Sequence, residues 1–200
     1  MGKFKLMTKK GYTLFEVASA FQKCIRRGME EDAMYWTVEL FNSGYDEYLW
    51  KRVRIITSED IGLANPTLPA VIASLYSSYL EQKKKKDTKH QPERLFITHA
   101  VLLLARSEKS RVVDHALLYF WSNHYCVSKQ IPSFAYDIHT KEGRRLGFGI
   151  DHFFKESTRL TNMAKIEKED YYKQQALCRL KDPCKPGPGT ADQTGQTSLL

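Results

Sequence analysis

The sequence predicts an all-α protein, a compact multi-helix bundle, on three observations. Apolar residues recur at intervals of three and four over most of residues 13–160, which is the spacing of one face of an α-helix. No segment shows the apolar–polar alternation between turn residues that is typical of β-hairpins. Glycine or proline stands at several boundaries between the periodic segments, where helices end and begin.

The first three helices are predicted over residues 13–28, 30–44 and 46–57. Thr13 and Glu16 have the spacing of a capping box at the start of the first helix. The first and second helices both end at a glycine, which readily adopts the left-handed conformation of a helix C-terminus.

An abrupt corner follows, which we call the acidic corner: Ser58-Glu59-Asp60-Ile61-Gly62-Leu63-Ala64-Asn65-Pro66. Gly62 tolerates a positive φ, and Asn65 is placed to cap the helix that Pro66 begins. The pattern therefore predicts that the chain turns sharply between two helices here.

The remaining helices are predicted over residues 66–80, 92–106, 110–121, 135–145, 151–160 and 167–180. A charged loop at 83–90 is expected to connect the first two of these. The helix at 92–106 is apolar on most sides and is expected to be central.

Four parts of the chain follow from these patterns: an N-terminal arm (1–12), a helical domain (13–160), an additional helix (161–180) and a tail (181–200). The tail is rich in Pro, Gly, Ser, Thr and Gln and is expected to be disordered. The Met start and this low-complexity end favour a complete small reading frame over a fragment of a longer protein.

The composition indicates which partners and which cellular compartment to expect. The formal net charge of +8 favours an acidic partner such as DNA. The apolar stretches are too short to cross a membrane, for which about 18 residues are needed, and no signal peptide is evident. Four cysteines without a CxxC pair are typical of reduced thiols, so we expect a cytoplasmic protein without a membrane partner.

Catalytic and cofactor sites are not predicted. A phosphate-binding loop requires the pattern GxxxxGK[ST], and this pattern does not occur. A helical metal-dependent hydrolase is the enzymatic alternative, because acids and histidines cluster at Asp114-His115, at Asp137 with His139 and Glu142, and at Asp151-His152. No HxxxH or HExxH pair places two ligands on adjacent helical turns, so we expect hydrogen-bonded helix histidines and no metal.

Four basic segments are candidates for contacts with DNA or another partner. They are Arg26-Arg27, the face of Lys51, Arg52 and Arg54, the lysine run Lys83–Lys86, and the group Lys141, Arg144 and Arg145. Arginines are the better candidates because guanidinium groups make bidentate contacts, whereas a lysine run in a loop is usually only solvated. Arg52 and Arg54 have a structural alternative, which is pairing with Glu59 and Asp60.

A surplus of aromatic residues suggests a subunit interface as a further use of the surface. The chain has 11 Tyr, 10 Phe and 3 Trp, and several stand where one helix cannot easily bury them all, among them Tyr45, Tyr48, Trp50, Phe148, Phe153 and Phe154. Aromatic residues beside arginines are typical of such interfaces, although core packing explains most of them.

Four stretches in order, over about residues 13–155, resemble the C-terminal helical region of the replication-associated recombination ATPases (RarA or MgsA, and the Werner-helicase-interacting protein). The acidic corner carries most of this resemblance. The other stretches are residues 20–28 with 32–36, the connector Leu104-Ala105-Arg106-Ser107-Glu108-Lys109-Ser110, and Ile131-Pro132 with Asp137, His139 and 146–149. The chain departs from the family in having Asn65 where Asp is usual and in lacking the ATPase.

The resemblance implies a helical domain like the collar of clamp-loader ATPases, which holds subunits together, usually as a tetramer. It assigns roles in the fold and the interface to Ser58, Glu59, Asp60, Gly62, Pro66, Asp137, His139, Gly147 and Gly149. The leading hypothesis is a non-catalytic oligomerisation module of DNA replication, recombination or repair, with DNA and a separately encoded AAA+ ATPase as candidate partners. A monomeric DNA-binding module and the metal-dependent hydrolase are the alternatives.

Overall fold

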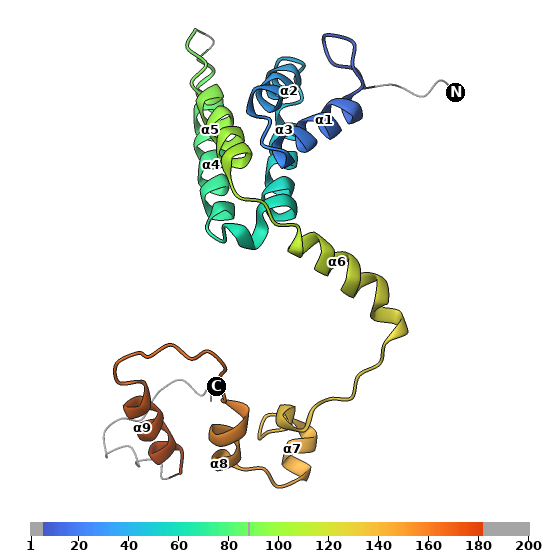
Figure 1. Ribbon diagram of the computed structural model, residues 1–200. Coiled ribbons are helices and arrows are strands. Elements are labelled where there is room, and N and C mark those ends of the chain that lie inside the picture. Colours follow the sequence, from blue (N-terminus) through green and yellow to red (C-terminus); the bar gives the residue numbers. More distant parts are fainter. Residues whose placement is uncertain (1–5, 88, 182–200) are drawn as a thin grey trace. The chain divides into compact units, whose positions relative to one another are not determined.

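The computed structural model describes residues 6–87 and 89–181, which form helices and turns (Figure 1). Within these residues the only β-pairing is an isolated bridge between Met7 and Thr13, so the all-α prediction is confirmed. The chain divides into two compact units, Met1–Val127 and Ser128–Leu200. The predicted boundary at residue 160 stays a prediction, and the predicted tail lies outside the described residues except for Lys181.

Five helices form the core of the first unit: α1 (Leu14–Arg26), α2 (Glu30–Asn42), α3 (Asp46–Ile56), α4 (Leu68–Lys85) and α5 (Glu93–Arg106). Helix α5 contacts each of the other four, as its nearly uniform apolar character predicted. The largest fully buried side chains of this core include Phe21, Trp50, Tyr79 and Leu104.

The capping box predicted at the start of α1 is wrong. The Thr13 side chain makes no capping hydrogen bond, and the backbone around it pairs with the N-terminal arm instead. The Leu14 amide donates to the Leu6 carbonyl at 2.9 Å. This pairing ties the described part of the arm to the first helix.

The helix after the acidic corner also begins differently from the prediction. Helix α4 begins at Leu68, with Thr67 and not Asn65 before it, and the Asn65 carboxamide accepts a hydrogen bond from the Thr67 hydroxyl at 2.9 Å. At the other end, α4 extends through Lys85 and ends at Lys86, which has a φ of 52°. The predicted charged loop is therefore shorter, because three of the four lysines form the last turn of α4.

Helix α6 (Val112–Asn123) follows where the sequence predicted a helix, but it buries no side chain. It continues into the short helix η3 (His124–Cys126). Leu117, Phe120 and Trp121 are 54%, 63% and 78% exposed, respectively. The apolar face that the periodicity indicated is therefore present, and the rest of the first unit leaves it exposed.

The described part of the second unit has short elements, η4 (Ser133–Ala135), α7 (Lys141–Arg145), α8 (Ile150–His152) and η5 (Phe153–Ser157), followed by the 13-residue helix α9 (Glu169–Lys181). The helix predicted at 135–145 is limited to its last five residues. The Thr140 hydroxyl caps α7 by accepting from the Gly143 amide at 3.0 Å, so the backbone before it is a turn. A Cβ at Gly143 would lie 1.9 Å from the Asp137 carbonyl oxygen, so this packing requires glycine.

Candidate interaction site at the acidic corner

The first half of the acidic corner is an extension of α3. The π-helical turn η1 (Thr57–Ile61) continues α3 directly, and the 3₁₀ turn η2 (Gly62–Ala64) follows. Gly62 has a φ of 46°, as its place in the corner predicted. A Cβ built on it would lie 2.9 Å from Cγ2 of Val113, so the corner also packs tightly against the first turn of α6.

Asp60 is the buried centre of this site, with a side chain that is 0% exposed. Its two carboxylate oxygens accept from Nε of Arg26 at 2.7 Å and from Nε2 of Gln22 at 3.1 Å. Arg26 also donates to Glu59 at 2.9 Å. The hydrogen bond to Asp60 is the main reason that the pKa of Arg26 is raised.

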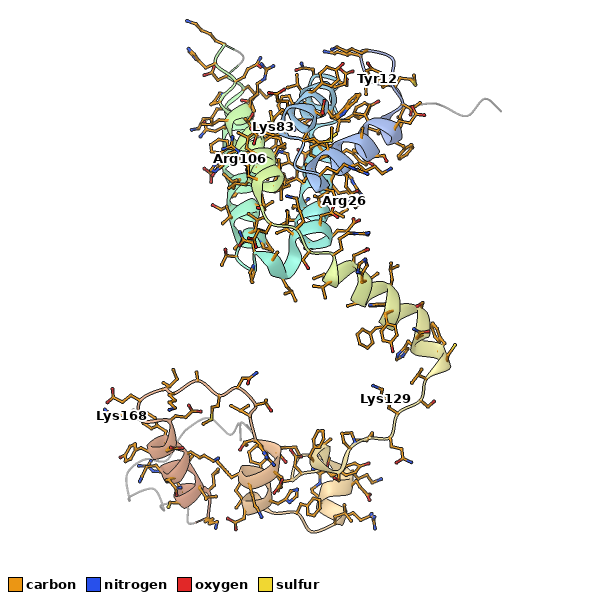
Figure 2. The ribbon with its side chains drawn as sticks, viewed as in Figure 1. Tyr12, Arg26, Lys83, Arg106, Lys129 and Lys168 are labelled. Atoms are coloured by element: carbon orange, nitrogen blue, oxygen red, sulfur yellow. The ribbon has the colours of Figure 1, made fainter. Side chains whose placement is uncertain are left out.

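The start of α6 is attached to the same two carboxylates. The Ser110 amide donates to the backbone carbonyl of Asp60 at 2.9 Å. The Arg111 guanidinium lies 3.6 Å from Oδ1 of Asp60 and 3.7 Å from Oε1 of Glu59, and it also pairs with Asp114. The corner therefore joins the ends of α1 and α3 to the beginning of α6, and Figure 2 shows Arg26 at the α1 end of this junction.

Lys109 fixes the connector between α5 and α6. Its ammonium donates to the carbonyl of Ala105 at 3.0 Å and to that of Ser107, at the end of α5. Burial lowers the pKa of Lys109, and the charge of Asp60 opposes this effect. The connector at residues 104–110 is thus held at both the end of α5 and the acidic corner.

The suggested pairing of Arg52 and Arg54 with Glu59 and Asp60 is wrong, because Arg26 and Arg111 are the partners of the two acids. Arg52 donates instead to the side-chain oxygen of Gln22. The Arg54 guanidinium lies over the Tyr76 ring, 4.6 Å from its centroid.

Arg27 is exposed and donates to the carbonyl of Lys23 at 3.2 Å. Ser58 and Pro66 are exposed, so their assigned roles at an interface stay predictions.

A groove of about 510 Å³ lies between α3, η1 and α6. It is lined by Lys51, Arg54, Ile55, Ser58, Glu59, Val113, Asp114 and Leu117. The lining combines three apolar side chains with two basic and two acidic ones.

The second unit holds the other predicted site residues. Asp137 accepts from the His139 amide at 2.9 Å, and the His139 ring packs edge-on against Phe153 at 5.2 Å. Gly147 has a φ of 74°, as tight turns require, whereas Gly149 has an ordinary extended backbone.

The cations of this unit differ in how they are held. Arg144 donates to the carbonyls of Ile138 and His139, both at 3.1 Å, and so fixes the turn before α7. Arg145 pairs with Glu142, while Lys141 is exposed. The structure thus gives Arg144 and Arg145 partners within their own unit.

Two findings concern a possible metal site and a possible membrane-spanning helix. In the described parts of the chain, no three His, Cys, Asp or Glu side chains lie together in a way that could hold a metal ion. Among the same residues, no helix combines the length and the apolarity that a membrane crossing requires.

Sequence reasoning missed Arg111 and the exposed end of α6. Arg111 could have been found from its position next to the connector, facing a corner with two acids. The exposure of Phe120 and Trp121 had no sequence signal, because an apolar helical face looks the same whether it is covered or not.

Comparison with known proteins identifies relatives of this chain. A family model described as the C-terminal part of the MgsA AAA+ ATPase matches residues 28–181. The replication-associated recombination protein A of Bacillus subtilis (strain 168) is 31% identical over 150 residues, which cover 72% of this chain and 33% of that protein. The proteins of the same name from Haemophilus influenzae and Escherichia coli K12 are each 24% identical, over 72% of this chain and 31% of their own length.

The chain therefore spans about a third of the length of these relatives. The matched residues, 28–181, include the acidic corner, the connector and part of each unit. This chain belongs to the family of MgsA AAA+ ATPase C-terminal domains.

Proposed function

We propose that this chain is a non-catalytic interaction module of DNA replication, recombination or repair that associates with copies of itself. The association uses the exposed apolar face of α6 and η3, which we call the α6 face: Leu117, Leu118, Phe120, Trp121 and Tyr125. A tetramer is the expected assembly, by resemblance to clamp-loader collars.

The α6 face is the observation that carries this proposal. Five apolar side chains within nine residues of chain are each more than half exposed. A helix that is apolar on most sides is normally buried, and contiguous exposed apolar surface marks an interaction site. Tryptophan and tyrosine are also the residues that contribute most to binding at protein interfaces.

The junction at the acidic corner supports a scaffolding role. It fixes the first turns of α6 to the five-helix core through Asp60, Glu59 and Arg111. The far end of α6 then extends from a defined attachment. A rigidly presented face binds with a smaller loss of conformational entropy than a mobile one.

The test compares two exposed phenylalanines. Phe120 on the α6 face is 63% exposed and Phe15 on α1 is 68% exposed, so Phe15→Ser is the matched control for Phe120→Ser. Light scattering on a size-exclusion column, over a range of micromolar concentrations, measures the mass of each variant. The unmodified chain and Phe15→Ser should give a multiple of 23.2 kDa, and Phe120→Ser should give a single chain.

A single chain for all three proteins would contradict the proposal. Affinity for DNA in such a monomer would favour the monomeric DNA-binding module. Stoichiometric metal after purification, with an activity lost on replacement of Asp137 or His139, would favour the hydrolase.

A AAA+ ATPase on another chain is the second proposed partner, because the family model describes part of such an enzyme. Sedimentation of a mixture with the ATPase portion of the Bacillus subtilis relative would measure this association. Co-sedimentation that is lost in Phe120→Ser would place both partners on the same face, and co-sedimentation kept in that variant would separate them.

A further inference from the structure

The described arginines of the first unit have partners within the protein. Arg26 and Arg111 bind the acidic corner, and Arg106 pairs with Glu30. Arg52 donates to Gln22 and Arg27 to a backbone carbonyl, while Arg54 and Arg94 lie over aromatic rings. The arginines that the sequence favoured for DNA contact are therefore held by the fold.

The free positive charge of this unit gathers instead at the turn between α4 and α5. Lys84, Lys85, Lys86 and Lys89 are exposed, and among the described residues no carboxylate, carbonyl or aromatic ring holds their ammonium groups. We call these four residues the lysine tip. Its one neighbouring acid within the turn, Asp87, is paired with His90.

The lysine tip is well anchored. Lys83, one residue earlier, binds Asp46 and Glu47 at the start of α3, and its ammonium lies 5.5 Å from the centre of the Tyr79 ring. The Asp87 carboxylate accepts from the amides of Lys89 and His90 at 3.1 and 3.0 Å. These contacts fix Lys83 before the tip and the backbone of Lys89 and His90 after it.

The tip is also remote from the α6 face within the first unit. Helix α4 has 18 residues, so its two ends lie about 27 Å apart at the rise of an α-helix. The acidic corner precedes one end and the lysine tip follows the other (Figure 1). A ligand of the tip therefore does not compete with the attachment of α6.

We propose that the lysine tip binds the phosphodiester backbone of DNA, without sequence preference. The four lysines lie within six residues of chain, so their ammonium groups are close enough to neutralise neighbouring phosphates, and such contacts release condensed counterions. No apolar side chain stands among the tip residues or beside them at Asp87 and His90, whereas a membrane-binding surface inserts apolar side chains. Lys84 and Lys85, in the last turn of α4, also interact favourably with the helix dipole. This interaction is the structural alternative to a DNA contact, because it needs no ligand.

The test is the salt dependence of binding to a short DNA duplex, measured by fluorescence anisotropy. Replacing Lys84, Lys85 and Lys86 by Gln removes three charges and keeps the helix-forming alkyl stems. The slope of log K against log salt should become shallower by about 2.7, as expected for three lost phosphate contacts. Affinity at low salt should fall at least tenfold.

The matched control replaces Lys165, Lys168 and Lys173, which are also exposed, by Gln and so lowers the net charge by the same amount. Its slope should stay close to that of the unmodified chain. Equal losses in both variants, or no loss in the tip variant, would overturn the proposal. Lysine-dependent binding to phosphatidylserine vesicles without binding to DNA would overturn it in favour of a membrane surface.

The outcome is independent of the proposed self-association. The tip variant should keep the mass of the unmodified chain in light scattering. Phe120→Ser should keep the salt slope per chain of the unmodified protein even as a monomer. A loss of DNA binding that follows Phe120→Ser, and not the lysine substitutions, would assign the contact to the α6 face and reject the tip.

Discussion

Helices α1–α5 and the chain from α6 onward differ in how they cover their apolar side chains. Every buried apolar residue of the described chain lies between Leu14 and Ala105. After Ala105, Gly143 is the one described residue that is buried. Both regions have the helical periodicity of amphipathic segments, yet only the first encloses a core.

The difference indicates that the first region stabilises the fold, whereas the second has side chains available for binding. The first region encloses a continuous apolar core, whose burial stabilises the fold, and its ion pairs tie helices to one another. The second region presents aromatic residues such as Trp121 and Tyr125 to solvent. Their contribution to stability should therefore appear only when a second surface covers them.

The largest expected effect compares two tryptophans, one from each region. Trp50 is 0% exposed and packs between Tyr76 and Tyr79, with ring centroids 5.2 and 5.3 Å away, whereas Trp121 is 78% exposed. Trp50→Ala should lower the free energy of unfolding by about 3–5 kcal/mol, because it leaves a large cavity. Urea denaturation followed by circular dichroism measures the loss.

Trp121→Ala serves as the comparison at a concentration where the chain is monomeric. Its effect on the same unfolding free energy should stay within about 0.5 kcal/mol, as for other exposed positions. Self-association should nevertheless weaken. Similar unfolding losses for the two variants would mean that α6 is part of the core and would remove the contrast between the regions.

The second prediction concerns the junction between the regions. Gly62→Val should lower the free energy of unfolding by about 2–3 kcal/mol, because the positive φ strains a β-branched residue and the new side chain meets Val113 of α6. Thermal and urea unfolding measure this loss. Hydrogen exchange should show that the amides of α6 lose protection first.

Gly44→Val isolates the backbone part of this effect. Gly44 has a φ of 81°, but nothing lies within 4 Å of a Cβ built there. The variant should suffer the strain without the collision and leave α6 protected. Equal losses at the two glycines would show that the contact with Val113 contributes nothing to the attachment of α6.

The contrast between the two regions also shows which features of the fold can be predicted from the sequence. The five core helices were predicted because periodicity reports which face of a helix is apolar, and in that region every such face is covered. Periodicity cannot tell whether a covering surface exists, so it described the stretch ending at Trp121 no differently from the core. The second unit was predicted less well, because Thr140 and Gly143 set its turn through contacts with Asp137 that no spacing reveals.

Charged pairs were the least predictable feature of the site. Proximity along the chain suggested Arg52 or Arg54 as partners of Asp60, but the packing of α1 against α3 brings Arg26 there from 34 residues away. Lys83 was expected to be solvated with its neighbours, and instead it binds two acids of α3. Such pairings depend on tertiary packing and cannot be predicted from neighbouring residues. The positive φ of Gly62 could be predicted, because it depends only on the turn in which the residue lies.

The smallest expected effect is a pH dependence that distinguishes the ion pairs of the two regions. Burial opposes the ionisation of Asp46, but hydrogen bonds from Lys83 and Tyr79 outweigh it and hold the pKa of Asp46 below its ordinary value. The ionised carboxylate therefore stabilises the fold above the pKa of an unfolded Asp, about 3.9, and this contribution is lost as the pH falls further. Asp46→Asn should lower the unfolding free energy by roughly 1–2 kcal/mol at pH 7, and the difference should shrink towards pH 3.

Glu142→Gln is the counterpart in the second unit. The hydrogen bond from Arg145 lowers the pKa of Glu142, but the two side chains are 41% and 68% exposed, so water and salt screen their attraction. Its urea midpoint should follow that of the unmodified chain from pH 7 to pH 3, while the midpoint of Asp46→Asn should converge on it only at the acidic end. Equal pH profiles for Asp46→Asn and Glu142→Gln would mean that the Lys83 pair is as weakly coupled to folding as an exposed one. In that case Lys83 would not anchor the lysine tip to α3.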